Sequence, residues 1–269
     1  MNLTLRNLFI LLTCTLLAGC DMFDSHPYDG HIHGEKGINE KNIAIIENTC
    51  LNKDTMKIAF TGDTQNFLEQ TEDMVSDINK RGDVDFLVHL GDFTDYGMTQ
   101  EFVWQTDILN KLSCPYVGLI GNHDVLGTGM DVYESMFGEQ NFSFIAGRIK
   151  FLCLNTNAME YDYSNPIPNF GFMKEEAKAD SGLYESTIVC MHARPGTEQF
   201  NNNVYDVWPH YVQLFPNVLF CISGHEHEPK VVDVYGDGMQ YYVTASGNRR
   251  EYYLFTITKG GYKYETIHY

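Results

Sequence analysis

Positively charged residues are scarce in this chain of 269 residues. Lysine and arginine number 18 against 36 aspartates and glutamates, so the formal net charge is −18 at pH 7. Such an excess of negative charge repels a nucleic-acid backbone at long range, and nucleic acid is therefore not expected as the main partner. Phosphate chemistry stays open, because bound cations can reverse the sign of the charge locally.

The most apolar run at the N-terminus, Leu8 to Leu17, is shorter than the roughly 20 residues that a helix needs to cross a bilayer. A basic residue, Arg6, precedes the run and small residues follow it, as is typical of a secretory signal peptide. The sequence Leu17-Ala18-Gly19-Cys20 resembles the lipobox of bacterial lipoproteins. That resemblance implies cleavage before Cys20 and acylation of its thiol.

We therefore expect residues 1–19 to be a lipoprotein signal peptide and residues 20–55 to be a lipidated tether and irregular lead-in. A weak helical pattern covers Ile43 to Asn48. The expected location is the extracytoplasmic face of a bacterial membrane, inner or outer, with the lipid on Cys20 as anchor. An ordinary secretory peptide with an incidental cysteine is the alternative.

The cysteines lack the spacing of a metal site or a disulfide framework. Five remain after Cys14 and Cys20, and they are scattered along the chain: Cys50, Cys114, Cys153, Cys190 and Cys221. The last three lie in apolar runs, where a thiol usually acts as a small buried hydrophobe. An odd number does not suit a set of bridges, although the compartment is oxidising. One bridge that involves Cys50 stays open.

From Met56 onward, short apolar runs alternate with helical patterns, and no linker divides residues 56–269. The runs Lys57–Thr61, Phe86–Leu90 and Tyr116–Ile120 are separated by stretches with apolar residues at helical spacing. Apolar strands that alternate with helices indicate a mostly parallel sheet covered on both faces. Two hairpin signals, at residues 236–238 and 259–261, predict that the second half is antiparallel. The expected class is a mixed two-sheet α/β domain.

Five apolar strands each end in residues that bind metals. These residues are Asp63 with Gln65, Asp92 with Asp95, Asn122-His123-Asp124, His192, and His225 with His227. Sites in open α/β sheets form outside the carboxyl ends of the strands, so these groups are expected to converge. Oxygen and imidazole ligands without thiolates suit Mn²⁺, Fe or Zn²⁺. The set is too large for one ordinary site and suits two ions that share a carboxylate.

The ordered blocks resemble the calcineurin-like metallophosphoesterase superfamily across residues 56–269. They read Gly62-Asp63-Thr64-Gln65, Gly91-Asp92-Phe93-Thr94-Asp95, Gly121-Asn122-His123-Asp124, Met191-His192 and Gly224-His225-Glu226-His227. The resemblance implies two mixed β-sheets packed face to face and flanked by helices, a four-layer αββα sandwich. It also implies a dinuclear-metal-dependent hydrolase of phosphate esters with a metal-bridging hydroxide as nucleophile.

The resemblance assigns roles to these residues one by one. One ion would lie among Asp63, Gln65, Asp92 and His227, and the second among Asp92, Asn122, His192 and His225. Two ions about 3.5–4 Å apart can clamp the phosphoryl oxygens of an in-line displacement. His123 resembles the acid that protonates the leaving oxygen, with Asp95 as its carboxylate partner and Asp124 as the competing partner. The alternative for both aspartates is a structural role in support of the ligands, without direct participation in catalysis.

The chain departs from the family pattern at Gln65, where most members have histidine. A glutamine amide is a weaker, neutral donor for Zn²⁺, so the first site is expected to favour Mn²⁺ or lower occupancy. Manganese-dependent diphosphatases acting on ADP-ribose and CDP-alcohols resemble this Asp-x-Gln form. A nucleotide diphosphatase or phosphodiesterase is therefore one alternative function. A lipid-anchored protein that binds phosphate ligands at a degenerate, non-catalytic site is another.

Substrate contacts are the least defined part of the sequence. Arg194 and Arg249-Arg250 are candidate phosphate clamps or, alternatively, members of surface salt bridges. The aromatic stretch Asn155 to Phe172 suits either a rim that stacks a ring or a packed structural loop. The expected partner is a small phosphorylated substrate, and whether it is a monoester or a diester stays open.

Overall fold

The computed structural model describes residues 32–161 and 166–269. The predicted signal peptide and Cys20 lie outside the described residues. Within the described part no helix is long and apolar enough to cross a bilayer. Cys50, Cys114, Cys153, Cys190 and Cys221 are all free thiols, so the bridge considered for Cys50 is not formed.

The first sheet has the order β11-β10-β1-β2-β3. Its strands are β1 (Thr55–Thr61), β2 (Phe86–His89), β3 (Tyr116–Gly118), β10 (Glu251–Thr258) and β11 (Gly261–His268). Strands β1, β2 and β3 are parallel, while β10 and β11 form an antiparallel hairpin whose first strand pairs with β1. The predicted helices between the parallel strands are α3 (Leu68–Arg81) and α4 (Thr99–Leu109). The alternation predicted from the sequence is confirmed here.

The second sheet has the order β4-β5-β6-β7-β9-β8. Its strands are β4 (Phe142–Ala146), β5 (Ile149–Leu154), β6 (Ser186–Met191), β7 (Val218–Ser223), β8 (Lys230–Asp233) and β9 (Gln240–Val243). Only the β4–β5 and β8–β9 pairs are antiparallel, whereas β5, β6, β7 and β9 are parallel to one another. The prediction of an antiparallel second half is therefore wrong for the centre of this sheet. Its intervening helices, α6 (Phe170–Glu176) and α7 (Trp208–Val212), are too short to give a clear helical periodicity.

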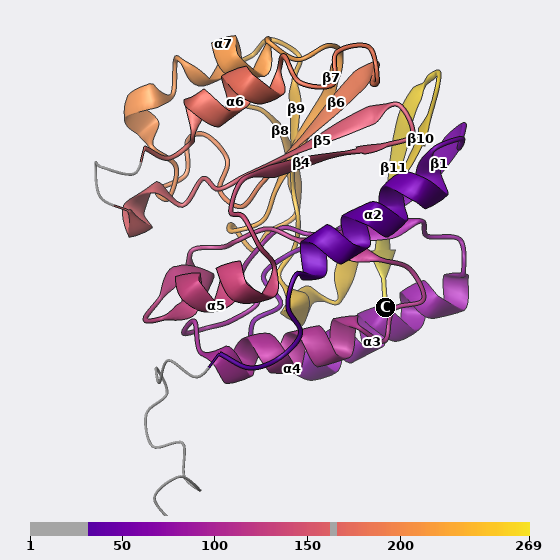
Figure 1. The fold of residues 1–269 in the computed structure, drawn as a ribbon, viewed down its shortest axis with the longest axis vertical. Helices are drawn as coiled ribbons and strands as arrows, with labels where there is room; N and C mark the ends of the chain where they lie inside the picture. The colour runs from indigo at the N-terminus through magenta and orange to yellow at the C-terminus, as the bar shows by residue number, and fades with distance from the viewer. Residues whose placement is uncertain (1–31, 162–165) are drawn as a thin grey trace, which may run out of the picture. The chain divides into compact units, whose positions relative to one another are not determined.

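Three clusters of buried residues show how the layers pack. The first lies between the two sheets and includes Phe60, Phe220 and Phe255, whose ring centroids are 4.4–6.2 Å apart. The second joins the outer face of the first sheet to α3, α4 and α5 (Gly129–Met136), and the third joins the second sheet to α6 and α7. Figure 1 shows α3 and α4 on one side of the two sheets and α6 and α7 on the opposite side. The predicted four-layer α/β sandwich is confirmed.

Helix α2 (Ile38–Cys50) belongs to the domain, so the predicted lead-in over residues 20–55 is wrong for its second half. Ile46 and Cys50 are fully buried in the cluster between the sheets. The Asn39 side chain bonds both the N–H and the carbonyl of Gly118 on β3, at 2.9 Å each. Glu47 accepts the N–H of Ile145 on β4 at 3.1 Å. Polar residues of α2 therefore face the edges of both sheets. As a result, the sequence of this helix shows only a weak apolar periodicity.

Four single turns of 3₁₀ helix connect these elements. They are η1 (His123–Val125), η2 (Ala158–Glu160), η3 (Asn202–Val204) and η4 (Gly247–Arg249). Turn η1 follows β3 and η2 follows β5, so both lie at the carboxyl ends of parallel strands. The predicted ligands lie in the loops at the carboxyl ends of β1, β2, β3, β6 and β7.

Candidate metal centre

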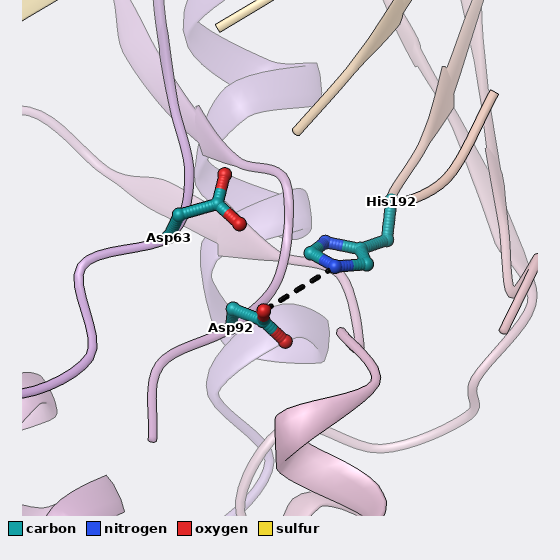
Figure 2. Close-up of side chains that lie close together, drawn as sticks. All are labelled: Asp63, Asp92 and His192. Atoms are coloured by element: carbon teal, nitrogen blue, oxygen red, sulfur yellow. Dashed lines mark ion pairs between the residues drawn. The ribbon is translucent and has the colours of Figure 1, made fainter. Parts of the chain in front are cut away.

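Two carboxylates and an imidazole meet where the two sheets face each other. Asp63 follows β1, Asp92 follows β2 and His192 follows β6, and all three side chains are at most 1% exposed. One potential ligand atom from each lies within 4.8 Å of the others. Figure 2 shows the three side chains turned toward a common point, although they come from different sheets. The convergence expected from the sequence is thus observed for these three residues.

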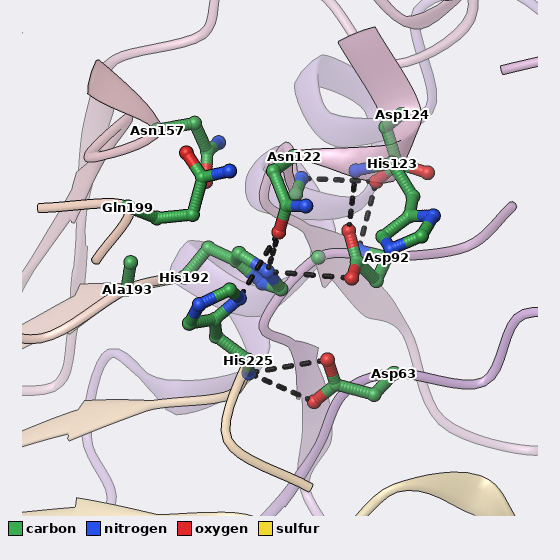
Figure 3. Close-up of polar contacts among 12 residues, drawn as sticks. Asp63, Asp92, Asn122, His123, Asp124, Asn157, His192, Ala193, Gln199 and His225 are labelled. Atoms are coloured by element: carbon green, nitrogen blue, oxygen red, sulfur yellow. Dashed lines mark hydrogen bonds and ion pairs between the residues drawn. The ribbon is translucent and has the colours of Figure 1, made fainter. Parts of the chain in front are cut away.

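The amide oxygen of Asn122 joins this group from the loop after β3. The Nε2 atom of His192 lies 2.9 Å from Asn122 Oδ1, and the Nδ1 atom of His225 lies 3.1 Å from the same oxygen (Figure 3). The main-chain N–H of His225 is shared between both carboxylate oxygens of Asp63, at 3.0 and 3.1 Å. Asn122, His192 and His225 therefore form one cluster, as the assignment to the second ion requires.

Two further residues are assigned to the first ion, His227 and Gln65. The Nε2 atom of His227 is 3.4 Å from Asp63 Oδ1. Gln65 is buried, and its main chain is fixed by a hydrogen bond from its N–H to the Asp92 carbonyl and by the side-chain amide of Gln105. The role of the Gln65 side chain as a ligand stays a prediction.

The backbone is strained at the predicted ligands. Eight non-glycine residues in the described ranges have positive φ angles. Five of them are predicted ligands, namely Asp63, Gln65, Asp92, His225 and His227, with φ between 39° and 71°. Such conformations cost of order 1–3 kcal/mol each and gather at functional sites, where the fold holds side chains in place. This concentration supports a function that depends on the exact aim of these side chains.

Asp124 organises the main chain around Asp92 instead of pairing with His123. Its buried carboxylate accepts the N–H groups of Asp92, Phe93, Thr94 and Gly121 at 2.8–3.0 Å. Burial and the nearby charge of Asp92 raise the pKa of Asp124 to about 7. The contacts of Asp124 therefore agree with a structural role and not with the role of carboxylate partner to His123.

His89 was not identified from the sequence, yet it links two ligand loops. Its ring is fully buried and stacks on Phe93 with centroids 3.8 Å apart. The Gly91 N–H donates to its Nδ1 at 3.3 Å, and its Nε2 lies 2.9 Å from the Thr64 hydroxyl. Burial lowers the pKa of His89 to about 3, so the ring is neutral and its Nε2–H donates to Thr64. A histidine at the end of an apolar strand, just before Gly91-Asp92, was the available signal.

His123 lies at the rim of the centre with its ring anchored by Asp95. Its Nδ1 is 2.8 Å from the main-chain carbonyl of Asp95, and the Asp95 carboxylate instead accepts from the side chain of Asn66. The predicted pairing of the Asp95 carboxylate with His123 is therefore wrong, because the main-chain carbonyl of Asp95 makes the contact. The main-chain N–H of His123 donates to Asp92 Oδ1 at 2.9 Å.

The charge balance of the centre suits cations. Asp63 and Asp92 are buried, and among the described residues they form ion pairs only with His227 and His192. Although burial lowers it, the carboxylates of Asp92 and Asp63 raise the pKa of His192 to about 9. Buried carboxylates without lysine or arginine need other positive charge. The oxygen and imidazole donors present fit two divalent ions, and no thiol lies among them.

The three arginines predicted as phosphate clamps are engaged in ion pairs, and Arg250 pairs with Asp73. Arg194 forms a two-pronged pair with Glu226, at 2.6 and 3.0 Å, and this glutamate lies between His225 and His227. Arg249 pairs with the exposed Glu228 at 2.8 Å. The salt-bridge alternative therefore describes all three arginines. Arg194 also links the turn that carries His225 and His227 to the loop after His192.

The aromatic stretch from Asn155 to Phe172 is largely part of the fold. Phe170 stacks on Tyr211 with centroids 4.1 Å apart, and Phe172 packs against the third buried cluster. Tyr161 donates its hydroxyl proton to Gln140 at 2.8 Å. These contacts favour the packed-loop alternative for the described part of the stretch.

Comparison with known proteins agrees with this geometry. The family model described as calcineurin-like phosphoesterase matches residues 56–229, which is more than half of the chain and includes every predicted ligand. None of the curated proteins compared with the chain matches it in sequence.

Solved structures with the same fold include proteins of diverse origin. GAP50, described as the anchor in the inner membrane complex of Plasmodium, matches with a TM-score of 0.61 at 12% identity over 80% of this chain and 85% of its own. A dimetal phosphatase from Danio rerio matches with a TM-score of 0.59 at 12% identity, over 80% and 99%. Purple acid phosphatase PPD1 from yellow lupin matches with a TM-score of 0.57 at 14% identity, over 76% and 50%. At these identities the likeness shows a shared fold.

Proposed function

The chain belongs to the calcineurin-like phosphoesterase family, and from this membership we propose that it hydrolyses phosphate esters at a centre for two divalent metal ions. One observation carries the proposal: Asp63, Asp92 and His192 bring ligand atoms within 4.8 Å of one another, at a buried site that has no lysine or arginine partner within residues 32–161 and 166–269. A site of this kind has little structural use without cations, since buried charge that is not balanced destabilises the fold.

The proposed ligands divide into two sets that share Asp92. Asp63, Gln65 and His227 hold the first ion, and Asn122, His192 and His225 hold the second. When bound, the two ions supply an activated water and neutralise the charge of the phosphoryl oxygens. The chain keeps these ligands aimed through Asp124, which fixes the Asp92 loop, and Arg194, which fixes the His225 turn.

His123 is the proposed general acid. Because the Asp95 carbonyl can only accept a hydrogen bond, Nδ1 of His123 carries a proton in every protonation state. The second nitrogen, Nε2, is then the atom that delivers a proton to the leaving oxygen. Asp95 acts through its backbone, as a positioning residue for this ring.

The proposed metal is Mn²⁺ with Fe or Zn²⁺ as the other candidates, since the amide of Gln65 replaces an imidazole that would favour Zn²⁺. The proposed setting is extracytoplasmic, with the chain anchored to a bacterial membrane through lipidated Cys20. The lipobox resemblance of Leu17-Ala18-Gly19-Cys20 supports this location.

Two other functions are each favoured by one observation. Gln65 favours a nucleotide diphosphatase or phosphodiesterase, through its resemblance to the Asp-x-Gln form. The same departure at Gln65, where most members have histidine, favours a non-catalytic protein that binds phosphate ligands at a degenerate site. Arg194, Arg249 and Arg250 are held in ion pairs and do not distinguish these functions.

Elemental analysis of the purified protein together with a substrate panel tests the proposal. The panel is p-nitrophenyl phosphate, bis-p-nitrophenyl phosphate and ADP-ribose, each with and without added Mn²⁺. We expect about two metal ions per chain and metal-stimulated hydrolysis of a monoester or diester. Preference for ADP-ribose would select the diphosphatase. Retention of phosphate ligands without hydrolysis of any of the three would overturn the enzymatic proposal.

A further inference from the structure

Both ring nitrogens of His225 face oxygen atoms that can only accept a hydrogen bond. The Nδ1 atom lies 3.1 Å from the amide oxygen of Asn122 (Figure 3). On the other side of the ring, Nε2 lies 3.5 Å from a carboxylate oxygen of Glu198, in the loop that follows β6. A neutral imidazole carries one proton, on one nitrogen or the other. The surroundings of the ring therefore decide which of the two oxygens this proton faces.

His192 makes the same choice through the main chain. Its Nδ1 atom lies 2.8 Å from the carbonyl oxygen of Leu90, so the proton is held on Nδ1. Its Nε2 atom then points to the amide oxygen of Asn122, at 2.9 Å, and is available to an ion. For His225 the corresponding position is occupied by the side chain of Glu198. A substitution can remove this contact, whereas the carbonyl of Leu90 is present in every variant.

The main chain around Glu198 is fixed, although the side chain itself is 78% exposed. Its neighbours Thr197 and Gln199 are both buried. The Thr197 hydroxyl donates to the carbonyl of Arg194 at 2.8 Å, and the Gln199 carbonyl accepts the N–H of Ala158 at 2.8 Å. The start of the Glu198 side chain is therefore held in place, while its exposed carboxylate can move closer to Nε2.

A second contact joins the loop of Glu198 to the turn of His225. The guanidinium of Arg194, from this loop, donates to both carboxylate oxygens of Glu226, at 2.6 and 3.0 Å. Both side chains of this pair are largely buried, at 14% and 18% exposed, and Glu226 directly follows His225. Bidentate pairs of this kind are geometrically specific. The pair therefore fixes the loop and the turn relative to each other and keeps Glu198 beside His225.

We propose that Glu198 is a positioning residue for the second ion: its carboxylate holds the proton of His225 on Nε2 and leaves the lone pair of Nδ1 for the metal. A charged acceptor forms a stronger hydrogen bond than the neutral amide oxygen of Asn122, so it attracts the proton. Histidine ligands commonly donate their other N–H to a carboxylate, which fixes the tautomer and makes the ligand more basic. Without Glu198 the proton can occupy Nδ1 and block the ligand atom. The inference rests on the proposed function, since it concerns a ligand of that centre.

The tautomer of His225 is measured in the metal-free protein by ¹⁵N NMR with labelled histidine, at a pH above the ordinary range of imidazole. The signals of this ring are identified by their loss in His225→Asn. We expect the proton on Nε2 in the wild-type chain and on Nδ1 in Glu198→Ala, where the Asn122 oxygen accepts it. Glu198→Gln keeps an oxygen acceptor without the charge and should give a mixture of the two tautomers. Glu175→Ala is the matched control, since Glu175 is exposed on α6, and it should resemble the wild-type chain.

Titration of the same chains with Mn²⁺, followed by calorimetry, measures the consequence for metal binding. Glu198→Ala should weaken one of the two binding steps about tenfold, the lower end of what loss of such a supporting contact costs. Glu198→Gln should restore part of this affinity, and Glu175→Ala should bind like the wild-type chain. An unchanged tautomer or an unchanged metal affinity in Glu198→Ala would overturn the inference, as would a proton on Nδ1 in the wild-type chain.

The tautomer measurement needs neither metal nor substrate, so it separates this inference from the proposed function. If the wild-type chain binds two ions and hydrolyses p-nitrophenyl phosphate, and Glu198→Ala does not differ from it, only the role of Glu198 is refuted. If the wild-type chain binds no metal and hydrolyses no ester, the proposed function is refuted. The tautomers of the two chains then still show whether Glu198 directs the proton of His225.

Discussion

The Nδ1 atom of His123 lies 2.8 Å from the main-chain carbonyl oxygen of Asp95. A carbonyl cannot take up a proton, so this contact orients the ring and leaves Nε2 as the atom that exchanges protons. A carboxylate in its place would also have stabilised the charged imidazole. The consequence is that Asp95 positions the His123 ring through its main chain and not through its side chain.

His123→Ala should keep metal content unchanged and slow esters with poor leaving groups most, because only these need a proton on the departing oxygen. We expect a loss of about 10²–10⁴-fold for alkyl phosphates and a smaller loss for p-nitrophenyl phosphate. Asp95→Asn serves as the comparison and should have a small effect on both, since its backbone carbonyl remains. Equal losses for good and poor leaving groups in His123→Ala would show that the ring is not the acid.

Asp92→Asn should remove metal and activity together. The assignment gives both ions a bond to this carboxylate, and an amide supplies a neutral, weaker donor. Metal per chain is measured by plasma mass spectrometry after dialysis, with circular dichroism to check folding. Asp107→Asn, on the exposed face of α4, carries the same change of charge and should retain full metal content. A folded Asp92→Asn protein with two ions bound would contradict the assignment.

Gln65→His should raise the affinity for the first ion and shift it toward Zn²⁺. Imidazole is a stronger donor for Zn²⁺ than an amide oxygen, and position 65 already has the strained backbone of the neighbouring ligands. Titration of the metal-free protein with Zn²⁺ and Mn²⁺ measures the two affinities. Identical binding curves for wild type and Gln65→His would exclude this position as a ligand.

Arg194→Gln should destabilise the domain by about 1.5–3 kcal/mol, since it breaks a largely buried charged pair and leaves Glu226 without this partner. Arg249→Gln breaks an exposed pair and should cost about 0–1 kcal/mol. Urea denaturation measures both changes, and metal titration shows whether the His225 turn has loosened. A higher KM in Arg194→Gln, with stability and metal affinity unchanged, would instead identify a substrate clamp.

The five thiols should be free and slow to react in the native protein. Burial raises the pKa of Cys114 to about 11, so its thiolate fraction at pH 8 is of order 10⁻³. Desolvation by burial also raises the pKa of Cys50, Cys190 and Cys221. A protein lacking residues 1–31 should give five thiols with Ellman's reagent in guanidinium chloride and far fewer without it. A count of three in denaturant would reveal a disulfide.

The parts of the fold visible in the sequence are those with strong local patterns. Thr71, Met74, Val75 and Ile78 follow helical spacing and are the buried residues of α3. The turns at 236–238 and 259–261 mark the two C-terminal hairpins, which are confirmed. The parallel pairing of β5, β6 and β7 was missed because it depends on contacts between distant strands, which a local pattern does not encode.

The position of the metal centre follows from the sequence, whereas the supporting contacts do not. Residues such as Asp63 and Asp92 are recognisable because polar groups at the ends of apolar strands lie at one edge of a sheet. The neutral His89, the main-chain contact of Asp95 and the pairing of Arg194 with Glu226 depend on atomic geometry. Those contacts form between separate loops, and a local sequence pattern does not give the relative positions of such loops.

Helix α2 also covers one edge strand of each sheet. By bonding to Gly118 on β3 and to Ile145 on β4, it occupies hydrogen-bonding groups that a foreign strand would otherwise use. The opposite edge strands are β11 and β8. Their charged residues, Lys263, Glu265 and Asp233, disfavour pairing with strands from other molecules. These features disfavour the pairing of sheet edges between copies of the chain.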